Sequence, residues 1–182
     1  MRILGISGSL RSDSHNRRLL QAAAALLPPE AELDVFGGLK AVEPFDEDDE
    51  ARPGLGVRGL RDAIAGADGL LIATPEYNSS IPGQLKNAID WASRPFSSPV
   101  LRNKPVAVIG ASTGMFGAVW AQADLRKTLA ASGARVIDRE LAVATAQDAF
   151  APDGSLLERE LVNELGGILA ELTGAIQLRQ AA

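Results

Sequence analysis

The amino-acid sequence predicts an α/β fold in which a doubly wound, five-stranded parallel sheet of strand order 2-1-3-4-5 carries helices on both faces. Three observations lead to this prediction. Short apolar segments alternate with segments of helical periodicity. Two apolar segments, residues 69–74 and 105–110, contain no polar alternation, which is typical of central parallel strands. The most distinctive polar loops all follow strands. The length of 182 residues fits a single domain, residues 1–182.

The first elements are two strands and a helix. Residues 1–4 form an apolar run that predicts a strand, and residues 16–27 have helical spacing and end at two prolines. Residues 32–36 predict a second strand that ends at two glycines. Residues 40–56 predict a loop, in which the acidic run at residues 46–50 is typical of a solvated segment.

The middle of the chain continues the alternation. A helix is expected at residues 57–67, followed by the apolar strand at residues 69–74. The next helix, at residues 81–91, carries a proline near its first turn, where proline is favoured. A strand at residues 105–110 then leads to a helix at residues 118–132, which a glycine ends.

The last two elements are a strand and a long helix. A fifth strand is expected within residues 135–143, although the polar residues 138–140 interrupt it. The last helix is expected to begin at Ser155, because Ser155 and Glu158 have the spacing of a capping box. Its buried stripe is expected to contain Leu157, Leu161, Leu165, Ile168, Leu169, Leu172 and Ile176.

Composition excludes several classes of function. The chain has no cysteine and one histidine, which excludes disulfides, thiolate catalysis and cysteine-ligated zinc. The formal net charge of −5 argues against nucleic acid as the main partner. No apolar run is long enough to cross a membrane, and the N-terminus does not resemble a signal peptide. We therefore expect a cytoplasmic protein without a metal site or a membrane partner.

The loop at residues 5–16 is the strongest candidate for a ligand site. It contains two glycines, four serines, an asparagine and Arg11 between a strand and a helix. Small residues, hydroxyl groups and a helix N-terminus suit a phosphate, and Arg11 can donate to two of its oxygens. The loop fits neither the nucleoside-triphosphate P-loop nor the glycine-rich dinucleotide motif. The alternative is an ordinary strand-to-helix turn that is rich in serine.

Two further loops, residues 75–82 and 111–117, follow the third and fourth strands. In a sheet of order 2-1-3-4-5 the first and third strands flank the switch point of the topology, where such sheets bind ligands. The loops at residues 5–16 and 75–82 are therefore expected to meet at one crevice.

At these loops the sequence resembles the NADPH-dependent FMN reductase family, in its chromate- and quinone-reductase-like branch. The resemblance rests on four motifs: Gly8-Ser-Leu-Arg11 with Ser14 and Asn16, Pro75-Glu-Tyr-Asn78, Ile81-Pro-Gly-x-Leu-Lys-Asn-Ala-Ile-Asp-Trp91, and Gly110-Ala-Ser-x-Gly114. The motifs lie in order and cover nearly the whole chain.

The resemblance implies a flavodoxin-like fold that binds FMN, with residues in three groups. Those expected to hold the phosphate are Ser9, Arg11, Ser14 and Asn16, with His15 nearby at a position where the pattern is loose. Those expected to contact the isoalloxazine ring are Pro75, Glu76, Tyr77 and Asn78. Those expected to line its far side are Ser112 and Gly114. Glu76 fits equally well as a residue that shapes its loop through backbone hydrogen bonds.

The implied activity is that of an FMN-dependent NAD(P)H oxidoreductase, which needs no acid–base residue of its own for hydride transfer. The acceptor is expected to be a quinone, a free flavin, an azo or nitro compound, or a metal oxyanion such as chromate. The family also implies a homodimer or homotetramer. Trp91 and Trp120 are expected to be core or interface aromatics.

Two alternatives remain open. One is a non-enzymatic electron-transfer protein of the flavodoxin type, against which the Pro75-Glu-Tyr-Asn78 loop stands. The other is a dinucleotide-binding protein with Asp34 on a ribose hydroxyl, which the spacing of the first loop disfavours.

Overall fold

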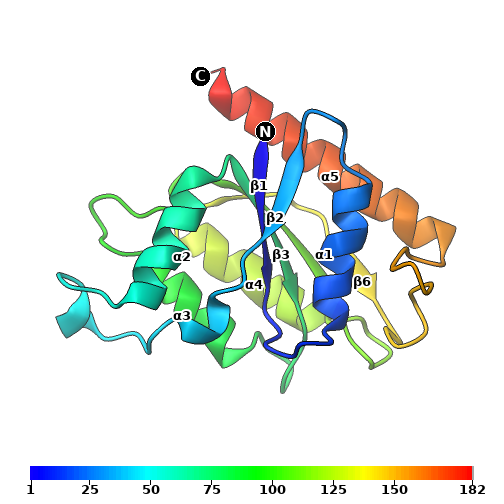
Figure 1. Ribbon diagram of the computed structural model, residues 1–182, viewed down its shortest axis with the longest axis horizontal. Helices are drawn as coiled ribbons and strands as arrows, with labels where there is room; N and C mark the ends of the chain where they lie inside the picture. Colours follow the sequence, from blue (N-terminus) through cyan, green and yellow to red (C-terminus); the bar gives the residue numbers. More distant parts are fainter. Residues whose placement is uncertain (182) are drawn as a thin grey trace.

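The computed structural model describes residues 1–181 and shows a parallel sheet in the order β2-β1-β3-β4-β5, as predicted (Figure 1). A sixth short strand, β6, pairs with β4. The strands are β1 (Arg2–Ser7), β2 (Glu32–Val35), β3 (Gly69–Thr74), β4 (Pro105–Ala111), β5 (Arg135–Val136) and β6 (Ala142–Val143). All five strand pairings are parallel. The α/β fold class and the strand order are confirmed.

The fifth strand is the part of the sheet where the prediction was wrong in detail. Residues 135–143 do not form one strand but two, β5 and β6, which pair with opposite ends of β4. The charged residues between them leave the sheet to form ion pairs. Glu140 pairs with Arg126 on a helix at 2.8 Å, and Arg139 pairs with Glu171 on another helix at 3.2 Å.

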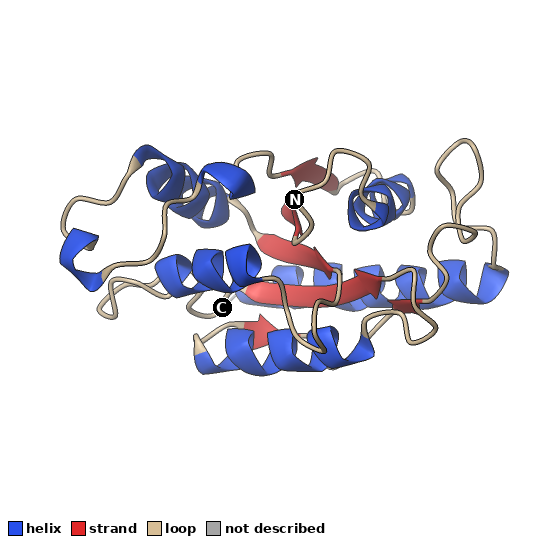
Figure 2. Cartoon of the chain, turned by 90° about the horizontal axis from the view of Figure 1, so that it is seen from below, coloured by secondary structure: helices blue, strands red, loops and turns tan. Residues whose placement is uncertain are grey.

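Helices cover the sheet on both faces, as Figure 2 shows. They are α1 (His15–Ala25), α2 (Leu55–Gly66), α3 (Gly83–Ala92), α4 (Val119–Ala131) and α5 (Arg159–Gln180), with two short 3-10 helices, η1 (Leu39–Ala41) and η2 (Glu47–Asp49). Alternate strand residues feed two separate cores. One core joins the sheet to α2, α3 and α4, and the other joins it to α1 and α5. Among residues 1–181, no helix combines the length and the apolar character that a membrane crossing requires.

The last helix begins later than predicted, at Arg159 instead of Ser155. Ser155 does not cap it, because the hydroxyl and the backbone N–H of Ser155 both donate to the Asp153 carboxylate, at 2.7 and 3.0 Å. These two bonds lower the pKa of Asp153. Leu157 therefore lies outside the helix and is exposed, whereas the rest of the predicted stripe is buried or half-buried.

The acidic run before α2 is exposed at residues 46–49, as predicted for a solvated segment, and it contains the short helix η2. Asp46 accepts from the backbone N–H of Asp48 and caps η2, and Glu50 pairs with Arg94 at 2.8 Å. Beneath it, Trp91 is 1% exposed and donates its indole N–H to the backbone oxygen of Glu43 at 2.8 Å. Trp91 is thus a core residue, as expected.

Candidate functional site

The loops after β1, β3 and β4 meet at the carboxyl edge of the sheet, and in Figure 1 those after β1 and β3 lie along the bottom edge of the molecule. A pocket of about 110 Å³ lies between them. Its lining includes most of the predicted residues: Ser9, Arg11, Ser14, His15, Asn16, Pro75, Glu76, Tyr77 and Ser112. Asn78 and Gly114 lie just outside it. Ala111 and Thr113 also line it and were not predicted.

Gly8 brings the first loop against the second. Its backbone N–H donates to the carbonyl of Ala73, the penultimate residue of β3, at 2.8 Å. A Cβ atom on Gly8 would lie 2.9 Å from Leu85 and 3.3 Å from Pro75. A side chain at this position would displace Leu85 or Pro75, and glycine avoids this. Gly8 therefore fixes the distance between the two loops that the topology brings together.

The first turn of α1 offers a set of free donors. Ser14 is the N-cap residue, and its hydroxyl oxygen accepts from the N–H of Arg17 at 3.4 Å. Among the described residues, no protein acceptor receives the backbone N–H groups of residues 9–16. Arg11 is exposed and pairs with no described acidic residue. Unpaired N–H groups and a guanidinium at a helix N-terminus suit a phosphate.

His15 adds a polar atom to this end of the pocket. Its Nδ1 is buried without a hydrogen-bond partner among the described residues. The imidazole ring stacks on Phe150, with 6.4 Å between the ring centroids. The guanidinium carbon of Arg18 lies 4.7 Å from the centroid of the Phe150 ring. No sequence signal placed Phe150 here. The orphaned nitrogen fits a site that is completed by a polar ligand.

Asn16 fastens the first loop to the end of β4. Its amide nitrogen donates to the carbonyl of Ala111 at 2.9 Å, and its amide oxygen accepts from the N–H of Ala111 at 3.0 Å. The side chain is 2% exposed, so both bonds are buried. One amide N–H remains for a ligand. Asn16 thus has a positioning role that sequence reasoning did not identify.

The second loop contains a tight turn with an unusual backbone. Tyr77 and Ser80 exchange two backbone hydrogen bonds of 3.0 and 3.2 Å, and the residues between them have positive φ angles, 53° for Asn78 and 59° for Ser79. Positive φ at both central positions defines a type I′ turn. Asn tolerates this conformation, whereas Ser79 is strained by roughly 1 kcal/mol. The turn leaves Tyr77 half exposed beside the pocket.

Two side chains join the second loop to α4. The carboxylate of Glu76 accepts from the backbone N–H of Ala121 at 3.1 Å, and the hydroxyl of Ser80 donates to Asp124 at 2.5 Å. The N-cap residue of α4, Ala118, has no side chain that could cap the helix. Glu76 supplies the missing acceptor and places a negative charge at the positive end of the helix dipole. This contact is a backbone hydrogen bond of the kind that the loop-shaping alternative for Glu76 requires.

The third loop is held by its backbone. Ser112 donates its N–H to Val143 of β6 and accepts from the N–H of Ala146, each at 3.0 Å. Its hydroxyl oxygen accepts from the N–H of Gly114 at 3.1 Å. The second half of the split strand, β6, therefore holds Ser112, which lines the pocket.

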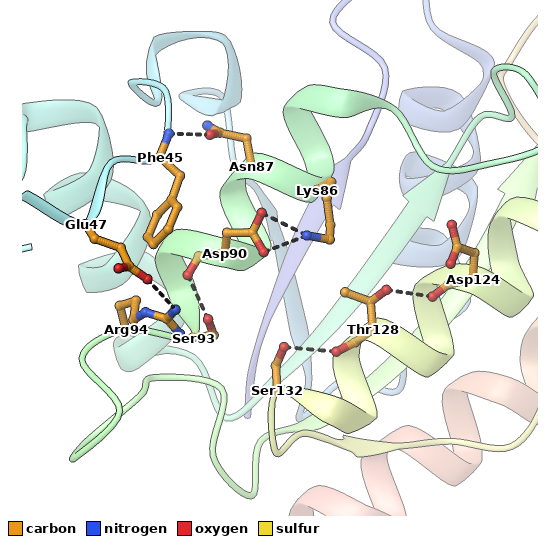
Figure 3. A network of polar contacts seen from close by, with 10 residues as sticks. All are labelled: Phe45, Glu47, Lys86, Asn87, Asp90, Ser93, Arg94, Asp124, Thr128 and Ser132. Carbon is orange, nitrogen blue, oxygen red and sulfur yellow. Dashed lines mark hydrogen bonds and ion pairs between the residues drawn. The ribbon is translucent and has the colours of Figure 1, made fainter.

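Figure 3 shows polar contacts made by side chains of α3 and α4. On α3, Lys86 pairs with Asp90 at 2.7 Å, and Asn87 accepts from the backbone N–H of Phe45 at 2.7 Å. On α4, the hydroxyl of Thr128 donates to the backbone oxygen of Asp124 at 2.9 Å. The carboxylate of Asp124 accepts from the hydroxyl of Ser80, and this bond joins α4 to the second loop.

Trp120 lies at the rim and not in the core. It is 48% exposed and packs edge-to-face on Phe116, with 4.9 Å between the ring centroids. Trp120 is the second residue of α4, in the first turn of the helix, and its side chain faces solvent there. Of the two roles expected for Trp120, this exposure excludes the core role, and the interface role stays a prediction.

Comparisons with known proteins agree with this geometry. The sequence pattern of the NADPH-dependent FMN reductase family matches residues 1–148. The chain is similar to an NAD(P)H-dependent FMN reductase of Pseudomonas aeruginosa, with 44% identity over 172 residues and 90% of each chain covered. It is also similar to a quinone reductase of Escherichia coli, with 32% identity over 97% of this chain and 96% of that one. Among solved structures, FerB, a flavoenzyme NAD(P)H:acceptor oxidoreductase of Paracoccus denitrificans, superposes with a TM-score of 0.85 at 34% identity over 97% of both chains.

The predicted resemblance, the flavodoxin-like fold, and the expectation of an FMN enzyme with a reduced nicotinamide as donor are confirmed. The family match covers all three loops of the site, and the first loop has free N–H groups that suit a phosphate. The chain belongs to the NADPH-dependent FMN reductase family.

Proposed function

We propose that this chain binds FMN in the pocket between its three loops and transfers a hydride equivalent from NAD(P)H to small organic acceptors, with quinones as the main class. The observation that carries the proposal is the convergence of the three family motifs on one pocket with an unsatisfied set of donors. Relatives named for quinones, a quinone reductase of Escherichia coli and a 2-hydroxy-1,4-benzoquinone reductase of a Burkholderia species, favour that acceptor class.

The phosphate of FMN would bind at the N-terminus of α1. Ser9, Arg11 and Ser14 offer two hydroxyl groups and a guanidinium, and the free N–H groups of residues 9–16 add neutral donors. Asn16 contributes its remaining amide N–H, and the orphaned Nδ1 of His15 lies at the same end. The donor set is positive and points into one pocket, so it matches a phosphate monoester in charge and in number of contacts.

The flavin ring would lie along the second and third loops. Pro75 and Tyr77 offer flat apolar surfaces, and the type I′ turn at Asn78 fixes the backbone that follows Tyr77. Ser112 and Gly114 would line the opposite side. Glu76 holds the turn in place through its bond to Ala121.

Bound FMN supplies the redox chemistry, and the residues of the chain bind and orient it. The balanced reaction converts NAD(P)H, a proton and a quinone into NAD(P)⁺ and a hydroquinone. The nicotinamide brings in the hydride and leaves, and solvent supplies the one proton that the reaction consumes. The site therefore needs an exposed ring face that donor and acceptor occupy in turn, and the shallow pocket with a half-exposed Tyr77 provides one.

The first test is the visible spectrum of the purified protein after incubation with FMN and gel filtration. We expect flavin bands at close to one FMN per chain. Anaerobic NAD(P)H should then bleach the bands, and a quinone should restore them. A protein that holds no FMN refutes the proposal, and FMN that NAD(P)H does not bleach would indicate an electron carrier of the flavodoxin type.

The expected homodimer or homotetramer is also part of the proposal. A groove of about 510 Å³ between α3 and α4 is lined by residues of both charge signs, including Lys86, Asp90, Asp124 and Lys127 (Figure 3). A face with both signs can pair with a second copy of itself about a two-fold axis. Light scattering at micromolar concentration tests this assembly, and the mass of a single chain would refute it. The cytoplasmic location stays a prediction.

A further inference from the structure

An exposed apolar patch follows the third loop. It consists of Met115, Phe116 and Trp120, whose side chains are 73%, 54% and 48% exposed. The rings of Phe116 and Trp120 pack edge-to-face at an angle of 65°. Large apolar side chains that gather in one exposed place indicate a binding surface more often than isolated ones do. Nothing in the FMN site as described requires this patch.

The chain segment that carries the patch is connected to the pocket both before Met115 and after Trp120. On one side, Thr113 lines the pocket two residues before Met115. On the other side, Ala121 follows Trp120 directly and donates its N–H to Glu76, which also lines the pocket. The aromatic pair is therefore tied to the second loop and the third loop at once.

The backbone between the two rings is rigid. Gly117 and Ala118 have φ angles of +56° and +66°, both in the left-handed region. A Cβ atom on Gly117 would lie 2.5 Å from the backbone of Ala142, and Ala118 is 1% exposed. A strained alanine persists only where its surroundings hold it, and such strain gathers at functional sites. The rings are thus presented on a turn that packing against β6 fixes.

We propose that Phe116 and Trp120 form an aromatic wall that binds the ring of a planar quinoid or aromatic acceptor. The wall makes this enzyme selective for such acceptors over compact inorganic ions, which gain little from contact with an aromatic ring. This inference rests on the proposed function and names the acceptor class of the same site. The planar acceptor is the occupant, because the patch continues the pocket and carries no charged side chain that would suit an oxyanion.

The test compares two acceptors that make different demands on the wall. One is 1,4-naphthoquinone, which takes up two electrons as one molecule, and the other is ferricyanide, of which two ions take up one electron each. The measured quantity is the ratio of kcat/KM for naphthoquinone to kcat/KM for ferricyanide. We expect Trp120→Ala and Phe116→Ala each to lower the ratio about 3- to 10-fold, through a higher KM for naphthoquinone.

Two further variants control this result. Trp120→Phe keeps an aromatic ring and should hold the ratio within about twofold of the wild type. Leu157→Ala removes a similarly exposed apolar side chain before α5 and should leave the ratio unchanged. A ratio that Trp120→Ala leaves unchanged overturns the proposal.

Tryptophan fluorescence supplies a readout that needs no turnover. The chain has two tryptophans, and Trp91 is buried in the core. Naphthoquinone added to the oxidised protein without NAD(P)H should quench the emission of Trp120, and Trp120→Phe should abolish the saturable part of the quenching. Quenching that survives in Trp120→Phe refutes contact at the wall.

The outcomes distinguish failure of this proposal from failure of the proposed function. Failure of the proposed function appears as absent NAD(P)H oxidation with every acceptor, and the quenching titration then still decides whether the wall binds a planar ring. Failure of the wall appears as an active enzyme whose ratio does not respond. If Trp120→Ala changes the mass of the assembly while the ratio is constant, the patch is a contact between subunits and the proposal is wrong.

Discussion

Replacing Asn16 by alanine separates the positioning role of this residue from its predicted contact with the phosphate. The substitution removes both buried bonds to Ala111, of 2.9 and 3.0 Å, and leaves the N–H and the carbonyl of this residue, which is 2% exposed, without their partners. An unsatisfied buried polar group costs about 1–3 kcal/mol. The two groups together should lower the free energy of unfolding of the FMN-free protein by about 2–4 kcal/mol.

Urea denaturation of the FMN-free protein measures this change, and thermal denaturation should show a Tm lower by about 5–15 °C. Asn163→Ala, at an exposed position on α5, is the matched control and should change the free energy by less than about 1 kcal/mol. If Asn16→Ala left the FMN-free protein as stable as the wild type and weakened only FMN binding, Asn16 would be a ligand contact alone. The reasoning from its hydrogen bonds would then be wrong.

Three other substitutions test the loops and the core around them. Arg11→Ala should weaken FMN binding by about 2–4 kcal/mol in a fluorescence titration, because it removes a charge-assisted contact to the phosphate. Arg17→Ala is its control, and equal losses would contradict the specific role of Arg11. Glu76→Gln keeps an acceptor for Ala121 but removes the charge at the start of α4, so it should destabilise the protein by about 0.3–1 kcal/mol in urea. A larger stability for this variant than for the wild type would oppose the capping role. The carboxylate of Glu43 accepts from its own backbone N–H and from N–H groups at the start of α2, which lowers its pKa. Its contribution to stability should therefore be present above pH 4.5 and be lost as the pH falls through the lowered pKa, so that wild type and Glu43→Gln converge in acid denaturation. A constant difference at all pH values would refute this assignment.

Local sequence patterns were sufficient for the parallel strands and for the loops of the candidate site, whereas the strand order came with the flavodoxin-like resemblance. The strand at residues 69–74 was predicted with the bounds that the structure has, because all six of its residues are buried and the apolar run ends where the burial ends. Parallel order follows from the alternation of strands and helices, and the order of the strands places the loops at one edge. Each of these inferences uses residues that are neighbours in the chain.

What the sequence did not reveal depends on partners far apart in the chain. Asn16 bonds a residue 95 positions away, and Glu76 bonds one 45 positions away. The error at Ser155 has the same origin on a shorter scale. The spacing of Ser155 to Glu158 fits a capping box. In the structure, however, the hydroxyl and the backbone N–H of Ser155 donate to Asp153 instead. A pattern states which partners a side chain can have, and only the fold decides among them.

The long-range bonds also explain how the fold holds the three loops of the candidate site. The first loop is fastened to β4 by Asn16, the second to α4 by Glu76, and the third to β6 by Ser112. Each loop is thus held by a different element, β4, α4 or β6, and these contacts position the donors of the proposed phosphate site. Preordered donors bind with a smaller loss of conformational entropy. It follows that Asn16→Ala should weaken FMN binding by more than the loss of one amide contact, because it also loosens the loop that carries Arg11 and Ser14.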